Sequence, residues 1–170
     1  MIRTAITASL AALTLGAASQ AQDFTLSAGY EAADFDAVEF DTAVFRGSYF
    51  FNENFGLEGQ LGFGLGDETV DVLGNDVNVE LDYTFGAYGV YRYAASDSVN
   101  LLARAGYVHA EVEADFAGFE ASEDDGAFAA GVAAEWFLDD ANGVRFDYTW
   151  ADYDDSTQFY GVSYVRRFGG

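Results

Sequence analysis

The stretch FGLEGQLGFGLG, residues 55–66, alternates between large apolar side chains and glycine or polar ones. In an extended strand, successive side chains point to opposite faces, so this stretch predicts one apolar and one polar face. The polar face is mostly glycine, which indicates a crowded surface such as the concave side of a small closed barrel. The large residues would then face outward into lipid: Phe55, Leu57, Leu61, Phe63 and Leu65.

The N-terminus has the pattern of a secretory signal peptide. Arg3 is followed by an apolar run over residues 5–15, with small residues at Ser19 and Ala21. The run is shorter than the roughly 20 apolar residues of a transmembrane helix. We therefore expect residues 1–21 to be a signal peptide and residues 22–170 to form one outer-membrane barrel domain.

Composition excludes several classes of function. The formal net charge is −22, whereas binding to nucleic acid needs a basic surface to neutralise phosphates. The chain has no cysteine, which excludes zinc–thiolate sites and cysteine nucleophiles. All seven basic residues are arginines, and an exterior without lysine suggests that much of the surface does not contact water.

Eight segments have the alternating or β-rich character of strands, an even number as an up-and-down barrel requires. Three short connections with turn-forming residues, at 52–54, 94–98 and 139–143, predict hairpin turns at the periplasmic end. Four longer acidic connections, at 31–41, 66–76, 111–126 and 151–157, predict loops at the other end. The expected strands are Phe24–Glu31, Asp41–Phe51, Phe55–Gly66, Val77–Tyr93, Val99–Glu111, Gly126–Leu138, Val144–Ala151 and Gln158–Phe168.

Charged residues fall on the inward side of this alternation, in equal numbers of each sign. Burial in a narrow lumen removes hydration, so we expect arginines and carboxylates to form ion pairs there. In the segment Val77–Tyr93 the same alternation predicts Leu81 and Tyr83 to point outward. The predicted lumen network consists of Arg46, Arg92, Arg104, Arg145, Arg167, Glu58, Glu80, Asp82, Glu135 and Asp147.

Over its whole mature length the chain resembles the small eight-stranded outer-membrane β-barrels, the OmpA/OmpX-like and opacity-type family. The likeness lies in FGLEGQLGFG, LLARAGYVHAEVE, GAFAAGVAAEWFLDDANGVRFDYTW and the closing FYGVSYVRRFGG. It implies an all-β, eight-stranded antiparallel up-and-down transmembrane barrel. It also implies that the barrel-assembly machinery recognises the last strand through Phe168, although this chain continues for two further glycines.

The resemblance places the protein in the outer membrane of a Gram-negative cell, after Sec-type export through the periplasm. Its expected partners are outer-membrane lipids, lipopolysaccharide and the barrel-assembly machinery. Divalent cations could bind the acidic loops, but no loop has the spaced ligands of a dedicated calcium site, so no metal or cofactor site is predicted. We predict a structural or surface role without enzymatic activity.

Three alternatives remain open at this point. A narrow porin-like channel for small solutes or cations would use the charged lumen as its lining. A lipid-modifying enzyme would need His109, the only histidine, together with a serine and a carboxylate. A soluble lipocalin-like binder would also have eight strands, but with an apolar interior.

Overall fold

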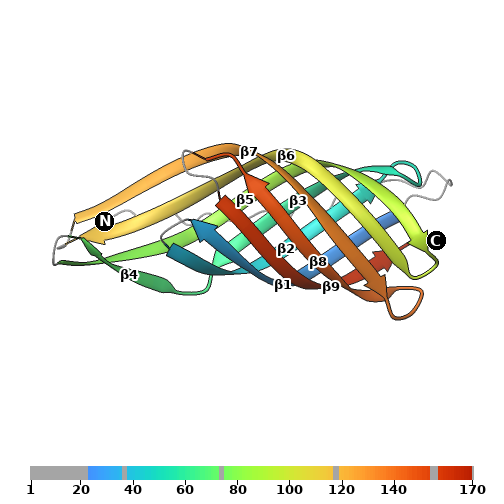
Figure 1. The fold of residues 1–170 in the computed structure, drawn as a ribbon, viewed down its shortest axis with the longest axis horizontal. Coiled ribbons are helices and arrows are strands. Elements are labelled where there is room, and N and C mark those ends of the chain that lie inside the picture. Colours follow the sequence, from blue (N-terminus) through green and yellow to red (C-terminus); the bar gives the residue numbers. More distant parts are fainter. Residues whose placement is uncertain (1–22, 36–37, 73–74, 117–118, 154–156, 170) are drawn as a thin grey trace, which may run out of the picture.

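The computed structural model describes residues 23–35, 38–72, 75–116, 119–153 and 157–169, and within these ranges it contains nine strands (Figure 1). The predicted signal peptide lies outside the described residues. The described ranges contain no helix long and apolar enough to cross a membrane. The strands are β1 (Asp23–Phe35), β2 (Val38–Phe50), β3 (Phe55–Gly64), β4 (Asp67–Val72), β5 (Asn75–Ser96), β6 (Val99–Phe116), β7 (Phe119–Phe137), β8 (Asn142–Ala151) and β9 (Thr157–Phe168).

The strands form one antiparallel sheet that closes on itself. The order is β3-β2-β1-β9-β8-β7-β6-β5-β4, and β3 also pairs with β5 from Phe55 to Phe63. β4 continues this pairing with β5 after a break at Leu65 and Gly66, so β3 and β4 are two parts of one interrupted strand. The nine segments therefore occupy eight strand positions around the barrel, which confirms the predicted eight-stranded up-and-down barrel.

Three strands are much longer than the others and far exceed what a bilayer requires. β5, β6 and β7 have 22, 18 and 19 residues, whereas about 9–11 suffice for a tilted transmembrane strand. In Figure 1 these strands and β4 run past the rest of the barrel, at the end opposite the C-terminus. The prediction of loops at 31–41, 66–76 and 111–126 is wrong for most of their length, because the backbone continues there as paired strands.

The short turns lie at the other end of the barrel and are held by side-chain acceptors. Oδ1 of Asn52 accepts hydrogen bonds from the amides of Asn54 and Phe55, at 2.9 and 2.8 Å. Oδ1 of Asp139 accepts from the amides of Ala141 and Asn142, at 2.8 and 2.7 Å. Such turns, in which a side chain caps its own backbone, allow the chain to reverse within a few residues.

Large apolar side chains cover the outside of the barrel, as the alternation predicts. Leu61 is 46% exposed and Phe85 is 49% exposed, while Glu58 and Arg145 are buried inside. An apolar exterior of this kind is stable in lipid and not in water. Aromatic side chains lie outward near both ends of the strands, where they suit the membrane interfaces: Tyr30, Phe51, Phe55, Tyr91, Tyr93, Tyr107, Trp136, Trp150 and Phe168.

A bulge in β5 reverses the predicted orientation of two residues. The register between β5 and β6 shifts between Leu81 and Tyr83, at the level where β3 gives way to β4. An extra residue in one strand inverts its alternation beyond that point. Leu81 is therefore fully buried in the lumen and Asp82 is exposed, contrary to the prediction for both.

Glycine allows neighbouring strands to come close at defined points. A Cβ atom on Gly106 of β6 would lie 2.0 Å from the carbonyl oxygen of Ala87 on β5. A Cβ atom on Gly59, on the outer face of β3, would have no other atom within 4 Å. The two glycines thus differ in whether the fold tolerates a side chain.

We predict that Gly106→Ala lowers the free energy of unfolding by about 1–3 kcal/mol, because the new methyl group would collide with the backbone of β5. Gly59→Ala is the matched control and should leave stability within about 0.5 kcal/mol of the parent. Urea titration in lipid vesicles, followed by tryptophan fluorescence, measures both. Equal stability of the two variants would contradict the close approach at Gly106.

Candidate functional site

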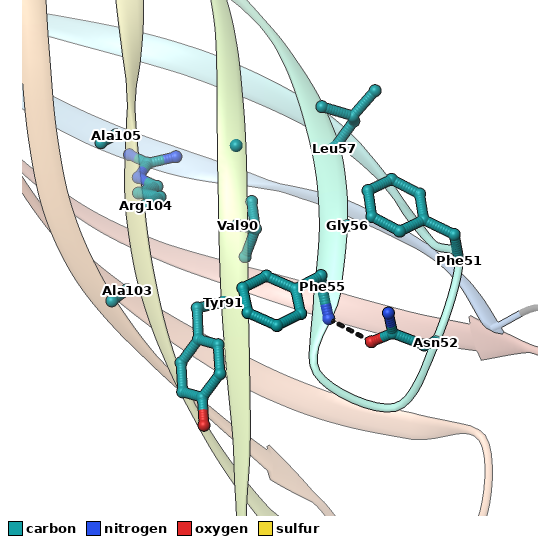
Figure 2. Close-up of a pocket in the computed structure, with 11 residues that line it drawn as sticks. Phe51, Asn52, Phe55, Gly56, Leu57, Val90, Tyr91, Ala103, Arg104 and Ala105 are labelled. Carbon is teal, nitrogen blue, oxygen red and sulfur yellow. Dashed lines mark hydrogen bonds between the residues drawn. The ribbon is translucent and has the colours of Figure 1, made fainter.

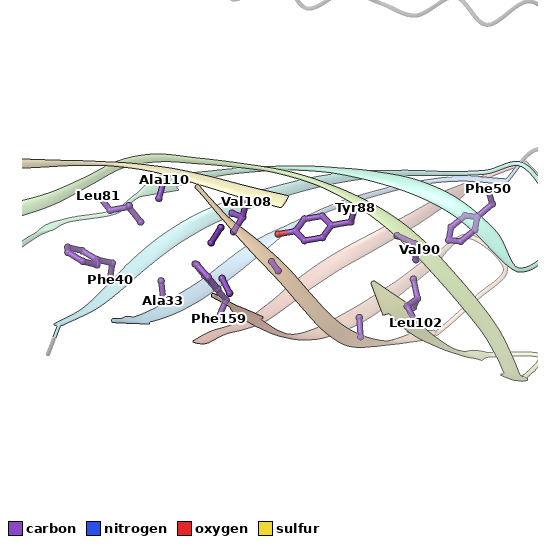
Figure 3. Close-up of a cluster of buried hydrophobic side chains, with 14 residues drawn as sticks. Ala33, Phe40, Phe50, Leu81, Tyr88, Val90, Leu102, Val108, Ala110 and Phe159 are labelled. Carbon is purple, nitrogen blue, oxygen red and sulfur yellow. The ribbon is translucent and has the colours of Figure 1, made fainter. Parts of the chain in front are cut away.

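The lumen is filled by side chains in layers along the barrel axis. On β6, Arg104 lies between the buried residues Leu102 and Val108 along the strand, and on β2, Arg46 lies between Phe40 and Phe50. Figure 3 shows one apolar group with Phe50, Val90 and Leu102 and another with Ala33, Phe40, Leu81, Val108, Ala110 and Phe159, on either side of Tyr88. We call the charged and polar side chains between these groups the charged layer: Glu31, Arg46, Glu58, Gln60, Arg104, Arg145 and Asp147.

Glu58 is the centre of the charged layer. Its Oε1 accepts hydrogen bonds from Nη1 of Arg104 at 2.7 Å and from Nη2 of Arg145 at 3.0 Å. Its Oε2 accepts from Nη1 of Arg145 at 2.6 Å and from the hydroxyl of Ser48 at 2.7 Å. With no exposed side-chain surface, this carboxylate has exchanged its hydration for four donors from β2, β6 and β8.

A second group joins Arg46 to Glu31 through an ion pair between Nη2 and Oε2. Gln60 connects this pair to the first group, because its Nε2 donates to Oε1 of Glu31 at 3.0 Å. Its Oε1 accepts from Nε of Arg46 and from Nη1 of Arg104, both at 3.0 Å. The Gln60 amide thus orients Glu31, Arg46 and Arg104 at once. It can do so because it is a neutral group between two like-charged arginines.

Asp147 contacts both groups of the charged layer. Its Oδ1 accepts from Nε of Arg145 at 2.9 Å, and its Oδ2 lies 3.5 Å from Nη1 of Arg46. Oε1 of Glu135 lies 3.9 Å from Nη1 of Arg145, while its Oε2 accepts from Asn100 at 3.2 Å. The charges therefore form a branched network that crosses the lumen.

A smaller charged group lies at the end of the lumen that carries the short turns. Asp23 pairs with Arg92 and lies 3.7 Å from Nε of Arg167. Each guanidinium also covers an aromatic ring, Arg92 over Phe50 at 4.0 Å and Arg167 over Phe137 at 3.9 Å. Such cation–π contacts offset part of the hydration that the guanidinium groups lose.

The structure brings together most, but not all, of the residues in the predicted network. Asp82 is excluded because the β5 bulge turns it outward, and the side chain of Glu80 lies outside the described part of the structure. The residues that the structure places in contact within the lumen are Arg46, Arg92, Arg104, Arg145, Arg167, Glu58, Glu135 and Asp147.

Two carboxylates of the network are absent from the predicted set. Glu31 lies in a segment predicted as an acidic loop, and Asp23 is the second residue after the predicted signal peptide. The alternation contained the signal for both, because Leu26, Ala28 and Tyr30 point outward and thus predict inward positions at odd numbers from 23 to 31. The strand simply extends further at each end than the turn residues suggest.

His109 lies on the outer face, away from the lumen. It is half-buried, pairs across the strands with Phe85, and its ring centroid lies 6.4 Å from that of Tyr83. Among the described residues, no group of three histidine or carboxylate side chains is arranged to hold a metal ion. Phe168, the predicted assembly signal, is 41% exposed and packs against Phe24 across the β1–β9 seam.

We predict that Glu58→Gln lowers the free energy of unfolding by about 3–5 kcal/mol, because Arg104 and Arg145 would lose their shared carboxylate inside the barrel. Glu53→Gln, in an exposed turn, is the control and should change stability by less than about 0.5 kcal/mol. The measurement is urea unfolding in vesicles. A Glu58→Gln barrel as stable as the Glu53→Gln barrel would show that the network contributes nothing to stability.

Solved structures with the same architecture include several outer-membrane barrels. Ail, the attachment invasion locus protein of Yersinia pestis, is 16% identical, with a TM-score of 0.65 over 88% of this chain and all of Ail; that structure contains the heparin analogue sucrose octasulfate. OprG of Pseudomonas aeruginosa is 12% identical, with a TM-score of 0.68 over 89% of this chain and 98% of OprG. The N-terminal β-barrel domain of OprF from the same organism is 10% identical, with a TM-score of 0.64 over 88% of this chain and all of that domain.

At these identities the structural matches establish the fold, and the sequence establishes the family. No curated protein matches the sequence. The model of the outer membrane protein beta-barrel domain matches residues 5–168, which is nearly the whole chain. The apolar exterior and the closed sheet agree with that match. The chain therefore belongs to the family of outer membrane protein beta-barrel domains, and its place is the outer membrane.

Proposed function

We propose that the protein is a structural, non-enzymatic barrel of the outer membrane, with a closed lumen and an acidic surface end. The observation that carries the proposal is the internal pairing of the charged layer. Glu58 uses both oxygens on two arginines and a serine, and Gln60 ties the remaining arginine to Glu31. Charges that satisfy one another in this way stabilise the barrel and leave few groups free to bind a passing solute.

The apolar groups on both sides of the charged layer support the same conclusion. Phe50, Val90 and Leu102 lie toward the short turns, and Phe40, Leu81 and Phe159 lie toward the long strands. An eight-stranded barrel has an interior just wide enough for side chains to fill. An ion on its way through the lumen would have to pass these apolar side chains on both sides of the charged layer.

A narrow cation channel is the second candidate, because several buried polar atoms of the lumen lack a hydrogen bond. Within the described residues these atoms are Asp23 Oδ1, Ser27 Oγ, Arg104 Nε, Glu135 Oε1, Asp147 Oδ2 and Arg167 Nε. Buried polar atoms are nearly always satisfied by protein or by water. Such atoms in one lumen would suit a chain of water molecules, which a conducting pore requires.

The route to the membrane is part of the proposal. We propose Sec-type export, removal of residues 1–21, and recognition of the last strand by the barrel-assembly machinery through Phe168. The exposed ring of Phe168 at the β1–β9 seam, where the barrel closes, supports that role. Lipopolysaccharide and divalent cations as partners of the acidic end stay predictions from the sequence.

The sulfated ligand in the Ail structure does not transfer readily to this chain. A heparin analogue is an anion, and this protein has a net charge of −22 with 29 acidic residues. Electrostatic repulsion would oppose the approach of such a ligand. We therefore propose that the surface end contacts cationic or neutral partners.

In planar bilayers, we expect the purified barrel to show no discrete current steps. The double variant Glu58→Ala/Arg104→Ala removes one charge of each sign and much of the bulk between the apolar groups, and we expect it to admit ions more readily. Single-channel recording in symmetric potassium chloride measures both proteins. Regular, cation-selective steps from the unmodified barrel would overturn the structural role in favour of the channel.

A further inference from the structure

The outer face of the barrel carries an apolar groove that crosses β9, β1, β2 and β3. Its volume is about 770 Å³. The inter-strand register aligns its centre, since Leu26 is opposite Gly47, and Gly47 is opposite Gly59. Among the residues that line the groove are Leu26, Phe45, Gly47, Gly59, Leu61 and Arg166.

Small residues form the floor of the groove and large ones form its wall. A Cβ atom on Gly59 would meet no atom within 4 Å, and one on Gly47 would only reach ordinary contact with Leu26 and Phe24. Phe45 and Leu61 are opposite one another in the next outward row and are 50% and 46% exposed. The floor of the groove is therefore a shallow depression, about one row of outward residues wide, with apolar side chains along its edge.

One end of the groove carries a positive charge. Arg166 is opposite Leu26 on one side and Asn142, at the start of β8, on the other, which places it close to the short turns. It is the one arginine that the structure exposes on the outer face of the described barrel, because Arg167, the next residue of β9, turns into the mouth of the lumen. Within the described residues its guanidinium has no carboxylate partner within 4 Å, and it lies 5.4 Å from the ring centre of Phe168.

A second groove on the outer face lacks such a charge (Figure 2). It lies over β3, β5 and β6, with Gly89, Ala103 and Ala105 as small residues and with Phe55 and Tyr91 beside them. Arg104 contributes to its lining, but the guanidinium of that residue is inside the barrel, where it pairs with Glu58. Both grooves are therefore apolar, but only the groove that ends at Arg166 also carries a charge.

We propose that the groove that ends at Arg166 binds one glycerophospholipid of the periplasmic leaflet. An acyl chain would lie along the floor at Gly47 and Gly59, and the phosphodiester would accept hydrogen bonds from the Arg166 guanidinium. An arginine that faces lipid near an interface is stabilised when it reaches a headgroup, and its planar fork suits phosphate oxygens. Because Arg166 is the one cation on the outer face of the described barrel, charge complementarity directs the phosphate to this position.

The test uses native mass spectrometry of the whole barrel in detergent, titrated with palmitoyl-oleoyl-phosphatidylglycerol or with the diacylglycerol that has the same two chains. We expect Arg166→Gln to weaken phosphatidylglycerol binding by about tenfold or more, the loss that corresponds to one charged hydrogen bond, and to leave diacylglycerol binding unchanged. Gly59→Leu, which fills the floor, should weaken binding of both lipids. Arg166→Lys should retain part of the affinity for phosphatidylglycerol.

The second groove supplies the matched control. Ala105→Leu fills it to a similar extent and should leave the affinity for phosphatidylglycerol within about twofold of the parent, since it touches neither Gly59 nor Arg166. Heat-modifiable migration on gels identifies the variants that fold. If Gly59→Leu does not fold, Gly47→Leu takes its place as the variant that fills the floor of the groove. The proposal is overturned if Arg166→Gln binds phosphatidylglycerol as the parent does, or if Ala105→Leu weakens binding as much as the groove variants.

Discussion

The whole structure depends on one constraint, that a backbone N–H or C=O group inside a bilayer must find its partner within the protein. A sheet meets this requirement only when it closes on itself, and here it does so because β1 pairs with β9 while β3 pairs with both β2 and β5. Closure with eight strands fixes a narrow interior. That narrowness explains the small residues on the inner face. One of them is Gly106, where any side chain would collide with the backbone of β5.

The same narrowness explains why the charges of the lumen are arginines matched with carboxylates. An isolated charge there would lose its hydration without compensation, whereas a planar guanidinium can contact several acceptors at once. Arg145 does so with Glu58 and Asp147, and Arg46 with Glu31, Gln60 and Ser163. The aromatic rings of Phe50 and Phe137 perform a related task for Arg92 and Arg167 at the mouth.

Alternation in the sequence predicted most of the fold, because a strand that is apolar on one side and buried on the other leaves little freedom of register. It predicted the inward position of Glu58, Arg104 and Arg145 for that reason. It failed at Leu81 and Asp82, since a bulge depends on the mismatch between neighbouring strands and leaves no mark in β5 alone. It also missed Glu31, because an acidic residue followed by Asp34, Asp36 and Glu39 resembles a loop although the backbone of β1 stays paired there.

Because the strands differ in length, two edges of the sheet, which we call margins, stay unpaired where the barrel extends beyond the membrane. β8 stops at Ala151, opposite Ala129, while β7 begins ten residues earlier at Phe119, so that part of β7 has no neighbour on the β8 side within the described chain. β4 forms the opposite margin, at the end of the sheet order. Unpaired strands invite other chains to add to them, and charged residues are a common defence against such polymerisation. The four carboxylates between Phe119 and Gly126 and the three in β4 give both margins the same sign, so neighbouring copies in a crowded membrane would repel one another where they would otherwise stick.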